Sequence, residues 1–395
     1  MQRKPTKRRR RAPIICAVIA ASLALLYCIA VFSPIPFIVY WRGIWIETAM
    51  TTADHQWLAT AFMPGFVIDR VMAETGSSDI IGGGEFLTEA NTSQPEDTDD
   101  SPGSVTESDA DTPITEKPEE TIAAEQTKPS GGDSYGSADG DILGLASMKV
   151  GAKDYAGNTI SVVDIDEGLF VSDIAKGEFK GKIMLIDDPS RVFLGVTTKA
   201  NEGLRIKDML SAYGAAAGIN ASGFADPNGE GSGAELIGLS CSQGTFSGEY
   251  VSYYGSVLLT NENKLVVGNV TIWNNKGIRD GIQFGPVLVA DGTAAVSGSA
   301  GYGLQPRTAI GQRSDGAIIM LVIDGRSILH SIGCTVGDMA EILLSYGCVN
   351  AACCDGGSSS VMAYGGEVIN VNSSANPTLG RRLPNAFLVK SKKST

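Results

Sequence analysis

The chain reads VGDMAEILLSYGCVNAACCDGGSSS from residue 336 to residue 360, and this stretch decides the fold class. Its first part predicts a helix over 336–346, opened by a Gly-Asp pair and ended by Gly347, with Met, Leu and Leu forming an apolar stripe. An apolar strand over 350–354 follows and leads Asp355 into a Gly-Gly-Ser-Ser turn. A helix and a buried strand joined so closely predict one core built from both kinds of element.

On either side of this stretch, short apolar segments alternate with Gly and Asn turns. The chain has 48 Gly among 395 residues, and only 7% of its residues are aromatic, which is typical of many turns and short strands. Strands outnumber helices, so we expect one α+β domain over 142–395, with a mixed twisted β-sheet and a few packed helices. Strands are predicted over 159–165, 181–186, 192–196, 215–219, 255–259, 264–267, 286–290, 318–323, 350–354, 360–363 and 386–389, with a second helix over 207–213.

The N-terminal region combines a basic tail with an apolar run. Residues 3–11 read RKPTKRRRR, and residues 14–32 carry no charged side chain. About 18–20 apolar residues can span a bilayer as a helix, and a basic flank is typical of the cytoplasmic side. A cleaved signal peptide is the alternative, but its apolar core is shorter and a small-residue cleavage site should follow, whereas this run continues to Trp41. We therefore expect a cytoplasmic tail over 1–13, a single-pass membrane anchor over 14–40 and an extracytoplasmic remainder.

Two further segments separate the predicted anchor from the predicted domain. Residues 41–73 carry apolar and aromatic side chains at helical spacing, which favours an amphipathic helix at the membrane surface or against a partner. His55 lies in this segment, and we expect a surface or interfacial side chain rather than a metal ligand. Residues 74–141 are rich in Ser, Thr, Asp, Glu, Pro and Gly and cannot bury enough apolar area to offset chain entropy. They predict a disordered acidic linker, and an interaction tail is the alternative.

The formal net charge of −13 is concentrated in this linker, where 16 Asp and Glu face two Lys between residues 85 and 141. The remainder of the chain from residue 142 is nearly balanced. It contains no basic patch with interleaved aromatic residues, so we expect no nucleic-acid partner. The oligomeric state stays open.

Five cysteines fall in the predicted domain, and none has the CxxC or Cys/His spacing of a zinc site. Cys334 and Cys348 flank a helix about 15 Å long, which is too far for a disulfide. Cys353 and Cys354 are adjacent in a predicted strand and should face opposite sides. We therefore expect free, buried thiols.

Three segments carry polar residues where predicted strands end. Residues 218–226 read GINASGFAD, and the small residues there would let a substrate approach the backbone. Residues 305–312 read QPRTAIGQ, and a buried strand then leads into Asp-Gly-Arg at 324–326. An arginine can bind phosphate or carboxylate oxygens in a bidentate manner. Residues 350–360 read NAACCDGGSSS, in which consecutive Gly and Ser N–H groups can form an anion-binding nest.

Each segment also has a purely structural interpretation. Asn220 is compatible with an ordinary turn, Asp324 and Arg326 with an ion pair at a strand end, and Asp355 with an Asp-Gly turn. His330 could border the pocket, although a surface loop position is favoured. The three segments together are more specific than any one of them.

In combination, the segments resemble the phosphodiester glycosidase family, whose best-known members remove a covering N-acetylglucosamine from mannose 6-phosphate tags. The resemblance covers about residues 145–390, and RRLPNA at 381–386 is similar to the family's end. Ala-Ser at 221–222 and Cys-Cys at 353–354 depart from the family's pattern, but they remove no acid or arginine. The family's elements occur here in order as 220–224, Gly-Pro-Val-Leu at 285–288, 306–311, 324–326, the helix at 336–346, and 355–359.

The resemblance implies hydrolysis of a sugar-1-phosphodiester without a cofactor, although a divalent cation is not excluded. Such hydrolysis needs carboxyl groups near the reacting carbon, and cations or N–H groups around the phosphate. We expect Asp324 and Asp355 to be the catalytic pair, with their individual roles open. The expected substrate-binding residues are Asn220 for a sugar hydroxyl or acyl group, Arg307 and Arg326 for the phosphate, and Gly356, Gly357 and Ser358 in the anion-binding nest. Thr308, next to Arg307, is also expected to bind substrate.

Two other functions stay open. One is a non-catalytic module that binds glycan or sugar phosphate at the membrane. The other is a metal-dependent phosphodiesterase that cleaves the P–O bond, with Asp226, Asp324 and Asp355 as oxygen ligands. In each case the expected place of action is just outside the cytoplasmic membrane of a bacterial-type envelope, on wall polymers or exopolysaccharides.

Overall fold

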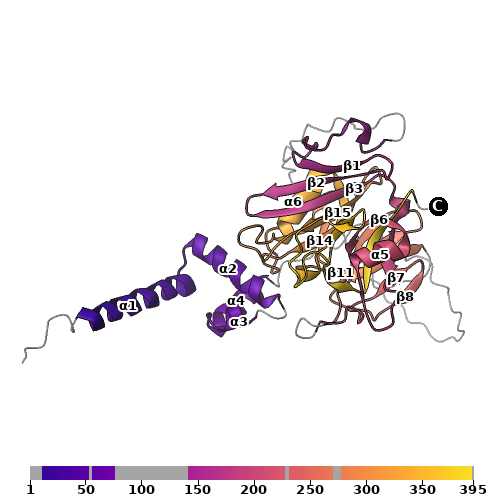
Figure 1. Ribbon diagram of the computed structural model, residues 1–395. Coiled ribbons are helices and arrows are strands. Elements are labelled where there is room, and N and C mark those ends of the chain that lie inside the picture. Colours follow the sequence, from indigo (N-terminus) through magenta and orange to yellow (C-terminus); the bar gives the residue numbers. More distant parts are fainter. Residues whose placement is uncertain (1–10, 53–55, 76–140, 227–230, 270–276, 394–395) are drawn as a thin grey trace, which may run out of the picture.

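The computed structural model describes residues 11–52, 56–75, 141–226, 231–269 and 277–393. His55 and nearly all of the predicted linker lie outside these ranges. Figure 1 shows a β-rich domain beside a group of short helices, from which the first helix extends away. These four helices are α1 (Arg11–Phe32), α2 (Pro36–Met50), α3 (Trp57–Thr60) and α4 (Gly65–Thr75).

The largest sheet of the domain has eight strands, and every pairing in it is antiparallel. Its central strand β15 consists of six buried apolar residues, as the sequence predicts for a strand covered on both faces. In spatial order the strands are β1 (Thr159–Asp164), β2 (Leu169–Lys176), β3 (Phe179–Ile186), β15 (Ile318–Ile323), β14 (Arg307–Arg313), β16 (Cys348–Cys354), β12 (Val287–Ala290) and β13 (Thr293–Ala294).

Two five-stranded antiparallel sheets cover one face of the large sheet, and a two-stranded ladder completes the domain. One five-stranded sheet has the order β10 (Leu265–Gly268), β9 (Gly255–Thr260), β11 (Ile278–Phe284), β7 (Ser240–Ser242) and β8 (Thr245–Ser247). The other has the order β18 (Glu367–Val368), β17 (Met362–Tyr364), β6 (Ala215–Asn220), β20 (Asn385–Lys390) and β4 (Val192–Val196). The ladder pairs β5 (Leu204–Arg205) with β19 (Arg382–Leu383).

Alternating side chains of β15 bury the two faces of the large sheet. Ile319, Leu321 and Ile323 pack on the side of α6 (Val336–Ser345), whereas the intervening residues pack toward the five-stranded sheets. Thr335 is the N-cap of α6 and forms a reciprocal capping box with Asp338. Asp338 is the Asp of the predicted Gly-Asp pair, and Thr335 lies two residues before that pair. On the outer face of the sheet that contains β6, α5 (Ile206–Tyr213) buries its apolar stripe. Helices and antiparallel sheets thus share continuous cores, which confirms the α+β class.

The N-terminal helices pack on each other and on the domain. Among the described residues, one segment, Ile14–Phe32 in α1, is long and apolar enough to cross a membrane. Arg42 of α2 donates to the carbonyl oxygens of Val31 and Ser33 at 2.8 and 3.2 Å, which satisfies carbonyls at the end of α1. The α2 helix, α3 and α4 then bury a small apolar cluster that includes Ile46, Ala59 and Ile68.

Thr48 joins α2 to the domain. Its hydroxyl accepts a hydrogen bond from the Leu304 N–H at 2.9 Å, and its carbonyl accepts one from the Gln305 side-chain amide at 3.0 Å. The same amide donates to the Thr52 hydroxyl at 2.9 Å. These bonds hold the end of α2 against residues about 250 positions later in the chain.

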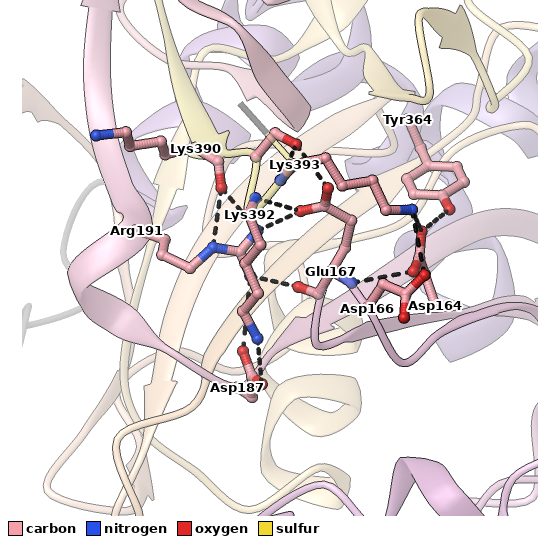
Figure 2. Close-up of polar contacts among 10 residues, drawn as sticks. Asp164, Asp166, Glu167, Asp187, Arg191, Tyr364, Lys390, Lys392 and Lys393 are labelled. Carbon is pink, nitrogen blue, oxygen red and sulfur yellow. Dashed lines mark hydrogen bonds and ion pairs between the residues drawn. The ribbon is translucent and has the colours of Figure 1, made fainter. Parts of the chain in front are cut away.

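The end of the chain is held by a buried ion pair (Figure 2). Arg191 and Glu167 lie 2.7 Å apart, with side chains only 8% and 4% exposed. Arg191 also donates to the Lys390 carbonyl, while Glu167 accepts from the Ser391 hydroxyl and the Lys392 N–H. Burial alone would raise the pKa of Glu167, but these hydrogen bonds and the charge of Arg191 together lower it.

All seven cysteines are free thiols, and the five in the domain are buried, as expected. Cys353 and Cys354 of β16 point into the cores on opposite sides of the large sheet. Burial raises the pKa of Cys353 to about 11, so this thiol stays protonated at neutral pH.

Candidate active site

Several strand ends meet around one cavity of about 570 Å³ at an edge of the large sheet. The start of β14 lies beside the ends of β15 and β16, because Arg307 pairs with Ile323 and Thr308 pairs with Cys354. The turn after β16 and the loop after β6 form two walls, and the segment between β11 and β12 forms a third. All three polar segments identified in the sequence therefore contribute residues to the cavity.

Asp355 is a half-buried carboxyl in the cavity wall. Burial raises the pKa of Asp355 to about 6, against the opposing effects of the Ser359 hydroxyl, the charge of Arg381 and the Gly356 N–H. About a tenth of the molecules therefore carry a protonated Asp355 at pH 7, against roughly a thousandth for an ordinary Asp. A carboxyl with such a pKa is suited to give or take a proton during a reaction.

Asp226 lies in the same cavity and is held by Arg381. Both oxygens of Asp226 accept bonds from the Arg381 guanidinium, one of them at 2.6 Å. Hydrogen bonding by Arg381 lowers the pKa of Asp226 despite its partial burial. The cavity thus contains two carboxyl groups whose pKa values are shifted in opposite directions. Arg381 also lies 4.9 Å from the ring centre of Phe224, so this pair and an aromatic face form one wall.

Arg326 lies beside the turn that follows Asp355, and both line the cavity. Gly356, Gly357 and Ser358 all line it, and the last two begin the 3₁₀ turn η7 (Gly357–Ser359). Gly357 has a φ of 61°, and a Cβ there would lie 3.1 Å from the Arg326 guanidinium. Glycine at 357 therefore lets this arginine approach the turn. Exposed Arg326 also bonds to the Gln305 side chain at 3.2 Å, which directs it along the cavity edge.

Arg307 lines the cavity but is largely occupied by backbone groups. It donates to the Cys334 carbonyl at 2.9 Å and to the carbonyls of Tyr302 and Gly303 at 2.9 and 2.8 Å. These bonds fix the loops around the cavity. Its buried positive charge also faces the space in which an anion would bind.

Asn220 and Thr308 are fully buried behind the cavity wall. The Asn220 amide donates to the Asp355 carbonyl at 2.6 Å, while its oxygen accepts from the Thr308 hydroxyl at 2.8 Å and the Val361 N–H at 3.0 Å. These bonds join β6, β14 and the turn that carries Asp355. Neither side chain is part of the cavity lining, so their geometry suits holding the turn rather than touching a sugar.

Asp324 does not face the cavity that contains Asp355. Its carboxylate accepts bonds from the Asn370 side chain and the Val371 N–H, both at 3.0 Å, and lies 2.8 Å from the His330 ring. Together with His330 it lines a separate cavity of about 560 Å³. Burial raises the pKa of Asp324, although its bond to His330 opposes this. The structure therefore separates the two carboxyl groups that the sequence predicts as a pair.

The partners of the two carboxyls account for this separation. Asp324 follows β15 and is held by Asn370 and Val371. Asp355 instead follows β16, and its N–H donates to the Ala221 carbonyl, at 2.8 Å, in the loop after β6. Both carboxyls follow a buried strand, but they line different cavities.

Aromatic side chains form the remaining walls of the cavity. The Tyr254 and Phe284 rings stack with centres 5.0 Å apart, and Tyr253 packs on Tyr254 at 4.7 Å. Burial raises the pKa of Tyr254 to about 12, so its phenol is neutral. Such flat faces suit the apolar sides of a sugar ring. A Cβ at Gly223 would lie 3.1 Å from Phe284, so a larger residue there would disturb this wall.

Several of these cavity residues are not among the site residues predicted from the sequence. For Arg381, the available signal is its charge in the segment RRLPNA at 381–386. Tyr254 directly precedes β9 and Phe284 is the last residue of β11, and no motif marks either of them. Thr52 reaches the cavity only because α2 packs there. Over the part of the chain that the structure describes, no group of three or more His, Cys, Asp and Glu side chains is arranged to hold a metal ion.

Comparison with known proteins identifies similar sequences and folds. The family model for phosphodiester glycosidases matches residues 213–390. The SPbeta prophage-derived uncharacterized protein YomE of Bacillus subtilis (strain 168) is 35% identical over 196 residues, which are 46% of this chain and 29% of that protein. The chain thus matches less than a third of that relative's length.

Two solved structures are also similar. One is the catalytic domain of zebrafish N-acetylglucosamine-1-phosphodiester alpha-N-acetylglucosaminidase, auto-inhibited by its pro-peptide. It is 16% identical, with a TM-score of 0.48, over 57% of this chain and 82% of that chain. The other is a hypothetical protein from Synechocystis, 16% identical with a TM-score of 0.45, over 58% of this chain and 64% of that chain.

Proposed function

We propose, from the premise that residues 213–390 carry a domain of the phosphodiester glycosidase family, that this chain hydrolyses a sugar-1-phosphodiester. The observation that carries the proposal is the pair of carboxyls in one cavity, with the pKa of Asp355 raised to about 6 and that of Asp226 lowered. Carboxyls whose pKa values are driven apart are suited to separate acid and base roles.

In the proposed reaction, the oxygen of water attacks C1 of the sugar. The bond between C1 and the bridging phosphate oxygen breaks, and that oxygen stays on phosphorus. Protonated Asp355 gives its proton to the departing phosphate oxygen, while ionised Asp226 accepts a proton from the water. Free sugar and a phosphomonoester result. Arg326 and the N–H groups of the turn at 356–358 stabilise the phosphate, and the aromatic walls hold the sugar.

The buried residues of the site are assigned positioning roles. Asn220 and Thr308 hold the turn that carries Asp355, and Arg307 orders the loops while adding positive charge. Asp324, which the sequence analysis pairs with Asp355, is assigned to the separate contact with His330 and Asn370.

The proposed place of action is the outer surface of a bacterial-type cytoplasmic membrane. The apolar segment Ile14–Phe32 would serve as a single-pass anchor with its basic flank inside, which supports an extracytoplasmic domain. Glycans of the envelope or exopolysaccharides that contain sugar-phosphate links are the proposed substrates.

Cleavage in ¹⁸O-labelled water tests the reaction. Full-length protein in lipid nanodiscs is incubated with N-acetylglucosamine-1-phospho-methylmannoside, with and without a chelator. Label in the released sugar, unchanged by the chelator, is the expected result. Label in the phosphate would contradict the proposal and favour a metal-dependent phosphodiesterase. Binding of this compound without any product would favour a glycan-binding module instead.

A further inference from the structure

A second cavity, of about 660 Å³, opens beside the active-site cavity, between α2 and the loop that follows β15. Its walls are mainly apolar. Trp41, Ile44 and Trp45 of α2 form one side, and Ile328 and Ile332 contribute to the other. We call this cavity the apolar groove. Unlike the active-site cavity, it has no carboxylate in its walls.

The apolar groove adjoins the active-site cavity. Thr52, Gln305 and Arg326 line both of them, and they form the boundary between the two. Arg326 lies at this boundary next to the turn that follows Asp355. A bound molecule that spans both cavities would therefore have an anionic group near Arg326, a polar sugar beyond it, and an apolar part in the groove.

The apolar groove also lies close to the candidate membrane span. The α2 helix begins at Pro36, only four residues after α1 ends at Phe32, and Arg42 ties the two helices together. On the opposite wall, Ile328 is 93% exposed. Exposed apolar side chains at both walls are typical of a surface that meets lipid.

We propose that the apolar groove holds the hydrocarbon chain of the substrate's aglycone, so that the substrate is a sugar-1-phosphodiester of a lipid alcohol. This inference rests on the proposed function, because it assigns the other half of the molecule that the active site cleaves. The bond broken is again C1–O, water supplies the new sugar hydroxyl, and a lipid monophosphate leaves. A peptide or a second copy of the chain could cover an apolar groove, but neither would need its connection to Arg326 and the anion site.

A chain-length series tests the groove. N-acetylglucosamine-1-phosphodiesters of methanol, hexanol and decanol are compared with full-length protein in nanodiscs, at concentrations below micelle formation. Each methylene that becomes buried should favour the complex by about fourfold. We therefore expect kcat/KM to rise by at least about tenfold from methyl to decyl. Equal values along the series would overturn the proposal.

Matched variants locate the effect. Trp45→Ala and Ile328→Asp should bring the decyl-to-methyl ratio of kcat/KM close to one. Trp57→Ala and Leu329→Asp should keep the wild-type ratio, because these side chains are 57% and 98% exposed but lie outside the groove lining. If the decyl-to-methyl ratio of kcat/KM fell close to one in both control variants as well, the chain-length effect would reflect non-specific partition of the substrate into lipid. That result would overturn the proposal.

A binding experiment separates failure of this inference from failure of the proposed function. A decyl phosphate with a photoreactive chain is cross-linked to the same protein, and the labelled peptides are identified by mass spectrometry. Labelling of residues 41–49 and 326–332, suppressed by excess decyl phosphate and by Trp45→Ala, would support the groove even if no diester were hydrolysed. Labelling confined to α1 would overturn it. A photoreactive residue at position 328 that links two copies of the purified chain would also overturn it.

Discussion

The half-buried carboxyl of Asp355, with its pKa raised to about 6, makes a prediction for stability. Ionising this group in the folded protein costs free energy, so wild-type protein should lose stability as the pH rises from about 4, the usual pKa of Asp, through the folded value. Asp355→Asn removes this cost. The variant should therefore unfold at an equal or higher urea concentration than wild type at pH 8, with the difference closing below pH 5.

Asp226→Asn is the matched control with the opposite sign. The pKa of Asp226 is lowered in the folded protein, so its contribution to stability is present above the unfolded pKa and is lost as the pH falls through the folded value. This variant should be destabilised at pH 8 and approach wild type in acid. If Asp355→Asn followed the same course as Asp226→Asn, the raised pKa of Asp355 would be contradicted.

Activity separates the two carboxyls that follow buried strands. Asp355→Asn should lower kcat by roughly 10²–10⁴-fold, the usual contribution of a general acid. Asp324→Asn should keep measurable activity, because this side chain bonds to Asn370 and His330 in another cavity. The wild-type kcat/KM should fall as the pH rises above about 6, because the acid is then ionised. Circular dichroism of both variants would control for folding. Equal loss of activity in both folded variants would restore the pair expected from the sequence.

These residues show how far sequence can locate a site. The Asp-Gly-Gly-Ser turn and its glycines could be assigned to an anion site because residue types alone carry that chemistry. The partner of Asp355 could not, because Asp226 reaches the cavity through the loop after β6 and its ion pair with Arg381. That ion pair joins segments about 150 positions apart, and no local pattern in the chain encodes it.

Among the elements, a strand can be predicted where it is an unbroken apolar run between turn residues. β15 and β16 are apolar runs bounded by turn residues, and their bounds differ from the prediction by two residues at most. β11 was missed because its sequence IRDGIQF contains charge and glycine. Its Asp280 is nevertheless fully buried, and Arg279 compensates its charge at 2.8 Å. β14 was recognised as a motif but not as a strand.

The contact between α2 and the domain depends on Gly303. Its φ is 58°, and a Cβ there would lie 2.5 Å from the Thr48 backbone nitrogen and hydroxyl oxygen. Gly303→Ala should therefore displace α2 and increase hydrogen exchange of its backbone amides. Gly298→Ala is the matched control, since its φ is 55° but a Cβ there meets no atom within 4 Å.

Both alanine variants carry the strain of a left-handed backbone, about 1–2 kcal/mol, so only the clash distinguishes them. Faster exchange in α2 with Gly303→Ala alone is the expected outcome, measured by mass spectrometry on protein in nanodiscs. Identical exchange in the two variants would mean that α2 is not held at residue 303. Because α2 forms one wall of the apolar groove, Gly303→Ala should also reduce the preference for the decyl substrate.

In the whole molecule, the β-rich domain and the apolar helix α1 lie on opposite sides of a small helical cluster. In Figure 1, α1 extends away from the sheets, while α2, α3 and α4 lie between them. The sequence predicts this order of segments from composition, since apolar, acidic and glycine-rich regions are compositionally distinct. It does not predict that α2 would supply a wall of the apolar groove, because the contact that holds α2 there joins residues about 250 positions apart.

The stability of the domain as a whole should depend on the buried pair of Glu167 and Arg191. This pair connects the turn between β1 and β2, the corner before β4 and the segment after β20 (Figure 2). Glu167→Gln removes the nearer carboxylate of the buried guanidinium and leaves only Asp187, at 3.7 Å. Loss of one member of a buried pair costs about 3–5 kcal/mol. We expect a loss of about 3 kcal/mol in the free energy of unfolding at pH 7, measured with urea.

The pH dependence and a surface control make this prediction specific. The pKa of Glu167 is lowered in the folded protein, so its stabilisation is complete above the unfolded pKa, about 4.3, and disappears as the pH falls through the lower folded value. The difference between wild type and Glu167→Gln should therefore shrink below about pH 4. Glu341→Gln removes an exposed pair with Lys176 and should change stability by no more than about 1 kcal/mol. Similar losses for the two variants would mean that burial adds nothing to the pair at the end of the chain.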